Sequence, residues 1–138
     1  MTEEEAKSKC DAIRQIAYDL HVYLGIGYLE KVYENGLAHR LSNAGYSVKT
    51  QVPIKVRDQD GYILGDYIAD LVVDGIVIEL KSAEHLSPAH IAQAINYLVA
   101  TKTPYGMIIN FGAFKFESRN LKNPKIQDSP DSTVLLQK

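Results

Sequence analysis

Three charged side chains, Asp70, Glu79 and Lys81, have the types and the spacing to do chemistry together. They lie in residues 67–81, which predict two strands rich in valine, isoleucine and leucine, joined by Asp74-Gly75. An Asp-Gly pair between such strands is typical of a two-residue type I′ hairpin. That turn places Asp70 directly opposite Glu79, with their Cβ atoms about 4.5–5.5 Å apart. Two carboxylates at that separation can share one divalent cation.

The rest of this hairpin predicts one apolar face and one charged face. Without a cation, two carboxylates on the charged face repel, and one of them is driven to take a proton. The alternative is an ordinary solvated face with surface ion pairs, and the hairpin alone does not separate the two interpretations. The pairing sets Val73 against Ile76 and Leu71 against Ile78, and alternation then gives an apolar face of Ala69, Leu71, Val73, Ile76, Ile78 and Leu80.

Three short motifs in the chain resemble those of a known nuclease superfamily. Asp70 followed by Glu-Leu-Lys at 79–81 resembles the D…(D/E)xK signature of the PD-(D/E)xK nucleases. Residues 27–33, Gly-Tyr-Leu-Glu-Lys-Val-Tyr, match the GxxExxY motif that names a small family within that superfamily. Residues 93–97, Gln-Ala-Ile-Asn-Tyr, resemble the QxxxY helix motif of its exonuclease-like members. The resemblance covers roughly residues 5–118.

This resemblance implies a restriction-endonuclease-like fold and metal-dependent hydrolysis of phosphodiester bonds. Asp70 and Glu79 would hold Mg²⁺ or Mn²⁺, assisted by the Leu80 carbonyl and by Glu30. The metal would lower the pKa of a bound water and polarise the phosphoryl oxygen. Lys81 would stabilise the nucleophile or the negative charge that develops on the phosphate.

Three more residues would handle the substrate if the resemblance holds. Gln93 and Tyr97, four residues apart on one helix flank, would position the substrate, and Tyr33 would orient Glu30. From spacing alone, a solvated flank and a core aromatic are the better interpretations of these side chains. The sequence departs from the signature at Ala69, where proline is expected; that proline is structural, so its loss leaves the metal site intact.

The elements that position these residues follow from periodicity and from turn signals. Thr2 and the acids after it predict a helix start, and apolar residues every three or four positions continue the helix to residue 24. A second helix follows to about residue 42. Gly27 before it would permit close backbone approach if the resemblance holds, and is otherwise a turn residue. A third helix starts at Ser87-Pro88, with a buried stripe of Ile91, Ile95 and Leu98. Strands are expected at 47–57, 62–73, 76–81, 104–111 and 114–118.

This order predicts an α/β domain with a mixed sheet, in which a three-stranded antiparallel meander is followed by a crossover helix and strand. Helices would flank the sheet. We expect one domain over residues 1–138, of which 120–138 form a loosely ordered polar tail. Pro53 would mark an edge strand or a bulge.

Composition bounds the function further. The acidic start and the lack of a long apolar run favour a cytoplasmic protein without membrane spans. Cys10 is the single cysteine, which excludes an intrachain disulfide. The net charge of −2 counts against tight non-specific binding of nucleic acid, although residues 101–126 hold five basic residues against one acid.

The expected function is a metal-dependent nuclease, with DNA a better candidate substrate than RNA. One alternative is a catalytically inactive module that binds nucleic acid or protein on the same scaffold. Another is an enzyme acting on a small phosphorylated molecule. Many nucleases of this size pair up to cut both strands, so a homodimer and a monomer both remain open.

Overall fold

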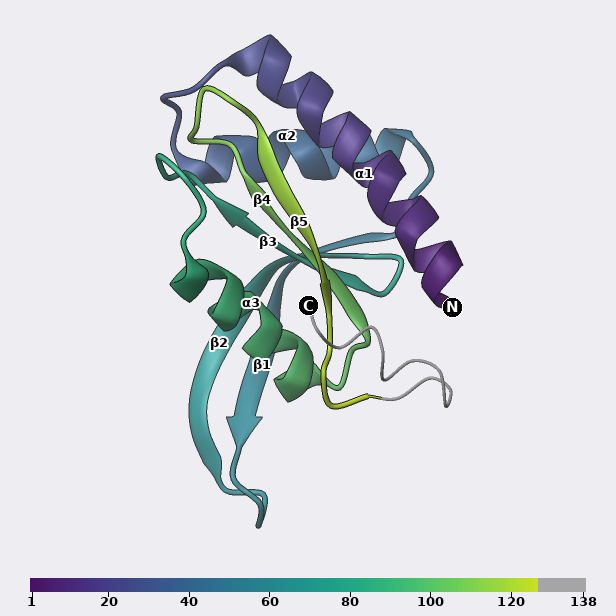
Figure 1. Cartoon of the computed structure of the whole chain (residues 1–138), viewed down its shortest axis with the longest axis vertical. Coiled ribbons are helices and arrows are strands. Elements are labelled where there is room, and N and C mark those ends of the chain that lie inside the picture. The colour runs from purple at the N-terminus through teal and green to yellow at the C-terminus, as the bar shows by residue number, and fades with distance from the viewer. Residues whose placement is uncertain (127–138) are drawn as a thin grey trace.

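A single mixed sheet of five strands lies between helices on its two faces (Figure 1). The structure, a computed structural model, describes residues 1–126. The strands lie in chain order across the sheet; β3 and β4 pair in parallel, and the other neighbours are antiparallel. The elements are α1 (Glu3–Leu24), α2 (Glu30–Asn43), β1 (Val48–Arg57), β2 (Ile63–Val73), β3 (Ile76–Lys81), α3 (Pro88–Thr101), β4 (Tyr105–Asn110) and β5 (Glu117–Lys122).

The predicted restriction-endonuclease-like α/β arrangement is confirmed. The meander of β1, β2 and β3 is followed by α3, which crosses over and returns the chain to β4 parallel to β3. Ser87 caps α3 and Pro88 is its first residue, as the sequence predicts. Thr2 and Glu5 form the expected capping box of α1. β1 is an edge strand, which explains why Pro53 is tolerated in it.

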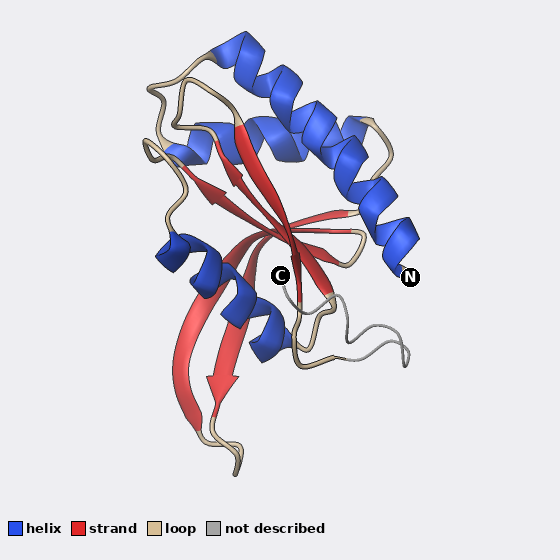
Figure 2. Cartoon of the chain, in the orientation of Figure 1, coloured by secondary structure: helices blue, strands red, loops and turns tan. Residues whose placement is uncertain are grey.

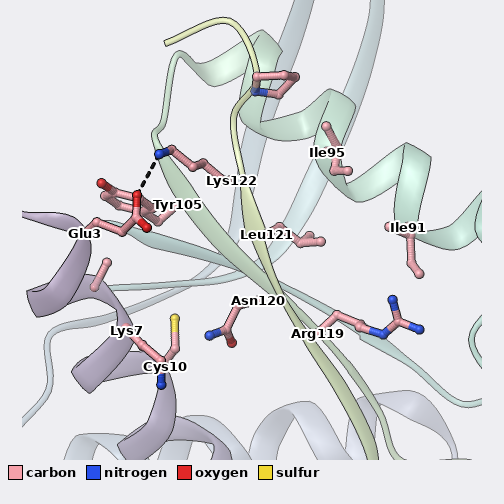
Figure 3. Close-up of a pocket in the computed structure, with 12 residues that line it drawn as sticks. Glu3, Lys7, Cys10, Ile91, Ile95, Tyr105, Arg119, Asn120, Leu121 and Lys122 are labelled. Atoms are coloured by element: carbon pink, nitrogen blue, oxygen red, sulfur yellow. Dashed lines mark hydrogen bonds and ion pairs between the residues drawn. The ribbon is translucent and has the colours of Figure 1, made fainter. Parts of the chain in front are cut away.

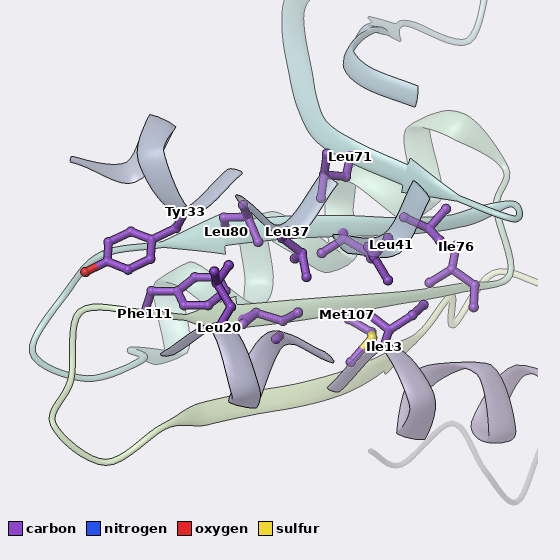
Figure 4. Close-up of a cluster of buried hydrophobic side chains, with 14 of the residues drawn as sticks. Ile13, Leu20, Tyr33, Leu37, Leu41, Leu71, Ile76, Leu80, Met107 and Phe111 are labelled. Atoms are coloured by element: carbon purple, nitrogen blue, oxygen red, sulfur yellow. The ribbon is translucent and has the colours of Figure 1, made fainter. Parts of the chain in front are cut away.

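Two apolar clusters hold the layers together, one on each face of the sheet. The first joins α1 and α2 to the central strands; Tyr33 and Phe111 stack within it at 4.8 Å between ring centroids (Figure 4). The second lies under α3, where Ala94, Tyr97 and Leu98 pack on side chains from all five strands. Burying apolar surface on both faces of one sheet is the main force that fixes its position.

The β2–β3 hairpin has the predicted turn and pairing. Asp74 and Gly75 both have positive φ, 47° and 85°, as a type I′ turn requires. Leu71 pairs with Ile78, as expected. The apolar face is correct except at Ala69, which packs in the second cluster rather than in the first with Leu71.

A distortion of β1 accounts for the different position of Ala69. Gln51 lies between the pairs Thr50–Leu71 and Val52–Ala69, and its φ of 52° departs from strand geometry. The two strands therefore change direction beside Asp70. Beyond this point they continue as a long hairpin past α3 (Figure 2).

Two expectations for the end of the chain are wrong. The last strand is Glu117–Lys122 rather than 114–118, because Phe114 is exposed and lies in the β4–β5 loop. The predicted tail starts too early: residues 120–122 lie in β5, and Asn123 is buried with its side-chain amide donating to the Leu98 and Thr103 carbonyls. Residues 127–138 of that tail lie outside the described part.

The predicted buried stripe of α3 is only partly correct. Leu98 is fully buried, but Ile91 and Ile95 are half-buried. The two isoleucines line a cavity of about 460 Å³ between α3, α1 and β5, and an ion pair between Lys122 and Glu3 lies at this cavity (Figure 3). None of the helices in residues 1–126 is both long and apolar enough to cross a membrane.

Candidate active site

Asp70 and Glu79 meet where β2 and β3 stop pairing through their backbones. The ladder between these strands runs from Val73–Ile76 to Leu71–Ile78. Beyond it, side chains link the strands. The Leu80 N–H donates to Asp70 Oδ2 at 2.8 Å, and the Asp70 N–H donates to Glu79 Oε1 at 3.3 Å. The hairpin therefore holds both carboxylates at one point, as its register predicts.

The site raises the pKa of three carboxyl groups, which we call the acid cluster: Glu30, Asp70 and Glu79. Burial is the main cause that raises the pKa of Glu79 to about 8, and the charge of Asp70 is the second. Glu79 is only 6% exposed. Burial is also the main cause of the raised pKa of Asp70. Desolvation and the charge of Asp70 raise the pKa of the Glu30 carboxyl, although the residue as a whole is exposed.

Lys81 is a cation whose charge acts on all three members of this cluster, and Lys31 acts on Asp70 as well. The charge of Lys81 lowers the pKa of Glu30, Asp70 and Glu79 but does not outweigh burial in any of them. Within the part of the chain that the structure describes, the Lys81 ammonium group has no hydrogen bond or ion pair. The ammonium group is therefore available to a ligand that brings negative charge to the cluster.

Glu34 is a fourth acid beside the site, and it was not predicted from the sequence. Its side chain is buried, pairs with Lys31 Nζ at 2.8 Å and accepts from Gln51 Nε2 at 2.8 Å. Its charge contributes to the raised pKa of Asp70 and of Glu30. The signal was the spacing: Glu34 follows Glu30 by four residues, which places both on one side of α2.

The loop between α1 and α2 positions Glu30 at the first residue of α2. Tyr33 fixes this loop: its hydroxyl donates to the Gly25 carbonyl at 2.6 Å and accepts from the Tyr28 N–H at 3.3 Å. Tyr33 is 0% exposed, so it supports the loop and has no surface with which to contact a substrate. No other part of the chain lies close to Gly27, since a Cβ added there would meet nothing within 4 Å. Glycine is needed at this position because its φ is 108°.

A second loop, after β3, fixes the strand end that carries Lys81. Asn110 pairs with Lys81 across the parallel ladder and is fully buried. Its amide bonds both the N–H and the carbonyl of Ala83, at 3.0 and 2.9 Å, and the Gly112 N–H at 2.9 Å. Gly112 is necessary because a Cβ there would lie 2.3 Å from the Ala83 nitrogen. Neither residue was predicted from the sequence to support the site.

The two substrate-handling residues of α3 differ in burial. Tyr97 is 8% exposed and packs in the second apolar cluster, so the solvated-flank interpretation is wrong for it. Burial, and then the charge of Glu79, raise the pKa of the Tyr97 hydroxyl. Gln93 is exposed, one turn nearer the N-terminus of α3.

The carboxylates suit a hard divalent cation in their chemistry. Mg²⁺ and Mn²⁺ prefer oxygen ligands, and one or two carboxylates are enough for Mg²⁺. Burial raises the pKa of Asp70 and of Glu79 more than the charge of Lys81 lowers it, and a divalent cation would favour the ionised form of both carboxyl groups. As placed, residues 1–126 contain no group of three or more acidic, histidine or cysteine side chains that could already hold a metal ion.

Known proteins resemble this chain in fold and in sequence. The crystal structure of SSO0001 superposes with a TM-score of 0.54 at 19% sequence identity, over 78% of this chain. This chain spans 58% of that protein's length, and the likeness shows a shared fold. A search of curated proteins found no match. A family model described as the PD-(D/E)XK nuclease superfamily matches residues 7–122, most of the chain. The chain therefore belongs to the PD-(D/E)XK nuclease superfamily.

Proposed function

We propose that the protein is a metal-dependent nuclease that hydrolyses phosphodiester bonds with the acid cluster and Lys81. One observation carries the proposal. Asp70 and Glu79 are held together at the end of the β2–β3 ladder, in a setting that raises the pKa of both. Superfamily membership supports the reaction class.

Each residue has a role that follows from its position. Asp70 and Glu79 would hold Mg²⁺ or Mn²⁺, with Glu30 and the Leu80 carbonyl as further oxygen donors. A bound divalent cation supplies a Lewis acid and a more acidic water. Lys81, whose ammonium group is uncommitted, would donate to the nucleophile or to the negative charge that builds up on the phosphate.

The GxxExxY segment and α3 complete the proposed site. The Gly27–Tyr33 segment carries the GxxExxY pattern and sets Glu30 at the start of α2. Gln93 and Tyr97 would position the substrate from α3. We propose DNA in preference to RNA as the substrate. We also propose a homodimer, in which the two copies would allow both strands of a duplex to be cut.

A cleavage panel tests the proposal. Labelled double- and single-stranded DNA and structured and linear RNA are incubated with Mg²⁺, Mn²⁺ or chelator. Lys81→Ala protein, purified in the same way, exposes contaminating nucleases, and Glu84→Gln, an exposed charge change three residues further on, is the matched control. We expect metal-dependent cleavage by the wild type and by Glu84→Gln, and loss of at least a hundredfold in Lys81→Ala.

The second candidate function is a binding module without catalysis on the same scaffold. It is favoured by the net charge of −2, which counts against tight non-specific binding of nucleic acid. Nucleic acid that stays intact with every metal, and is bound equally well in chelator, would establish this second function. Equal cleavage by the wild type and Lys81→Ala would contradict the nuclease proposal.

A further inference from the structure

A groove runs between α3 and the outer half of the β1–β2 hairpin. We call that outer half the arm (residues 54–67) and the space beside it the arm groove. Its volume is about 1000 Å³, at the upper end of the range for pockets that take a drug-sized ligand. Residues from β1, the arm turn, β2 and α3 line it.

Basic side chains outnumber acidic ones along this groove. Lys55, Arg57 and Lys102 line it, against Asp58 as the lining acid; Lys55 is paired with Asp66 at 2.5 Å, which leaves Arg57 and Lys102 for a ligand. Arg57 donates to the Gly61 carbonyl at 3.1 Å, which holds its guanidinium group at the arm turn. Lys102 lies just past the C-terminus of α3 and is exposed. On a protein with a net charge of −2, such a groove is a local site for a polyanion.

Aromatic rings connect the groove to the acid cluster. Tyr67 on the arm is 45% exposed, and its ring centroid lies 5.5 Å from that of Tyr97. Both rings line the groove. Tyr97 packs in the same apolar cluster as Ala69 and Val77, which precede Asp70 and Glu79 in β2 and β3 by one and two residues. The groove therefore approaches the acid cluster at Tyr97.

We propose that the arm groove binds an unpaired nucleic-acid strand, with bases stacked on Tyr67 and phosphates bound by Arg57 and Lys102. This inference rests on the proposed nuclease function and names its substrate class. Only an unpaired base presents a free face to an aromatic ring, because the bases of a duplex are stacked on one another. Gln93 and Asn96, the amides on the α3 side, can bond base edges without selecting one sequence.

Binding in chelator tests the inference apart from cleavage. Anisotropy of a labelled 12-nucleotide DNA single strand of mixed sequence is compared with that of its blunt duplex. We expect the wild type to prefer the single strand at least tenfold. Tyr67→Ala should weaken single-strand binding about tenfold, and Tyr67→Phe, which keeps the ring, should restore it. Tyr23→Ala, an exposed tyrosine on α1 outside the groove, is the control.

Salt dependence tests the phosphate contacts. Arg57→Gln and Lys102→Gln should each lower the slope of log affinity against log salt by about 0.7, while Lys7→Gln on α1 leaves it unchanged. Equal affinity for duplex and single strand, or full binding by Tyr67→Ala, would overturn the groove assignment. So would a Tyr67→Ala change confined to oligomeric state, which would assign the groove to a second copy.

The two proposals fail in different ways. If the groove variants bind as the wild type does, but metal-dependent cutting is still lost in Lys81→Ala, the nuclease proposal stands and the groove assignment falls. If single-strand binding depends on Tyr67 while no substrate is cut, the groove assignment stands and the protein is a binding module.

Discussion

Glu79 makes the free protein sensitive to pH. Its pKa is about 8 in the folded chain, against an ordinary value of 4.5, so the folded state binds a proton more tightly than the unfolded state does. Stability without metal should therefore fall as the pH rises from about 4.5 to about 8. Glu79→Gln should flatten this decline and raise the melting temperature at pH 8.

The check is a series of thermal melts between pH 5 and 8.5 in chelator. Glu84→Gln, which changes an exposed carboxylate in the loop after β3, should follow the wild type at every pH. A wild-type melting temperature that stays level across this range, or a Glu79→Gln protein that declines as steeply as the wild type, would show that Glu79 is not held as described.

At this scale the sequence predicted the chemistry better than the supports. Asp70, Glu79 and Lys81 were found because a two-residue turn fixes which side chains face one another. Glu34 and Asn110 were not, since each acts through partners far away in the chain: Gln51 for the first and the loop at Ala83 for the second. No local pattern indicates these contacts, although the four-residue spacing from Glu30 places Glu34 on the same side of α2.

At the scale of elements, the loop after β3 depends on Asn110. Asn110→Ala would leave the Ala83 N–H and carbonyl and the Gly112 N–H without their partner. Since each unpaired buried group costs about 1–3 kcal/mol, we expect a loss of about 2–4 kcal/mol in the free energy of unfolding. Cleavage should fall further than stability explains, because this loop anchors the strand end that carries Lys81.

Denaturant unfolding measures the stability change. Asn96→Ala, an exposed asparagine on α3, is the matched control, and alanine's higher helix propensity should leave it as stable as the wild type or slightly more stable. An Asn110→Ala protein that unfolds at the wild-type denaturant concentration would refute the anchoring role.

The elements themselves were predictable where local signals are strong. Capping residues and the Asp-Gly turn fixed α1, α3 and the β2–β3 hairpin. The last strand was misplaced because Phe114–Ser118 alternates as well as 117–122 does, and only pairing with β4 selects between them. The place of Ala69 depends on the positive φ of Gln51, which no propensity predicts.

For the whole molecule, the two apolar clusters share one sheet and should unfold together. Leu71 and Ile78 pack on one face of the sheet, and Val77 and Ile108 pack on the other. A chain under 150 residues with such a shared core is expected to unfold in a single transition. Calorimetric and van't Hoff enthalpies should agree; two resolved transitions would contradict the expectation of one domain.

The central claim is that Asp70 and Glu79 form a divalent metal site, and a Mn²⁺ titration tests it most directly. Asp66→Asn is the matched control for Asp70→Asn, because Asp66 lies on the same strand, exposed and paired with Lys55 at 2.5 Å. Free Mn²⁺ is followed by electron paramagnetic resonance at pH 8. We predict binding by the wild type and by Asp66→Asn, and at least tenfold weaker binding by Asp70→Asn. Equal binding by Asp70→Asn and the wild type, or none by the wild type at millimolar Mn²⁺, would contradict the metal site.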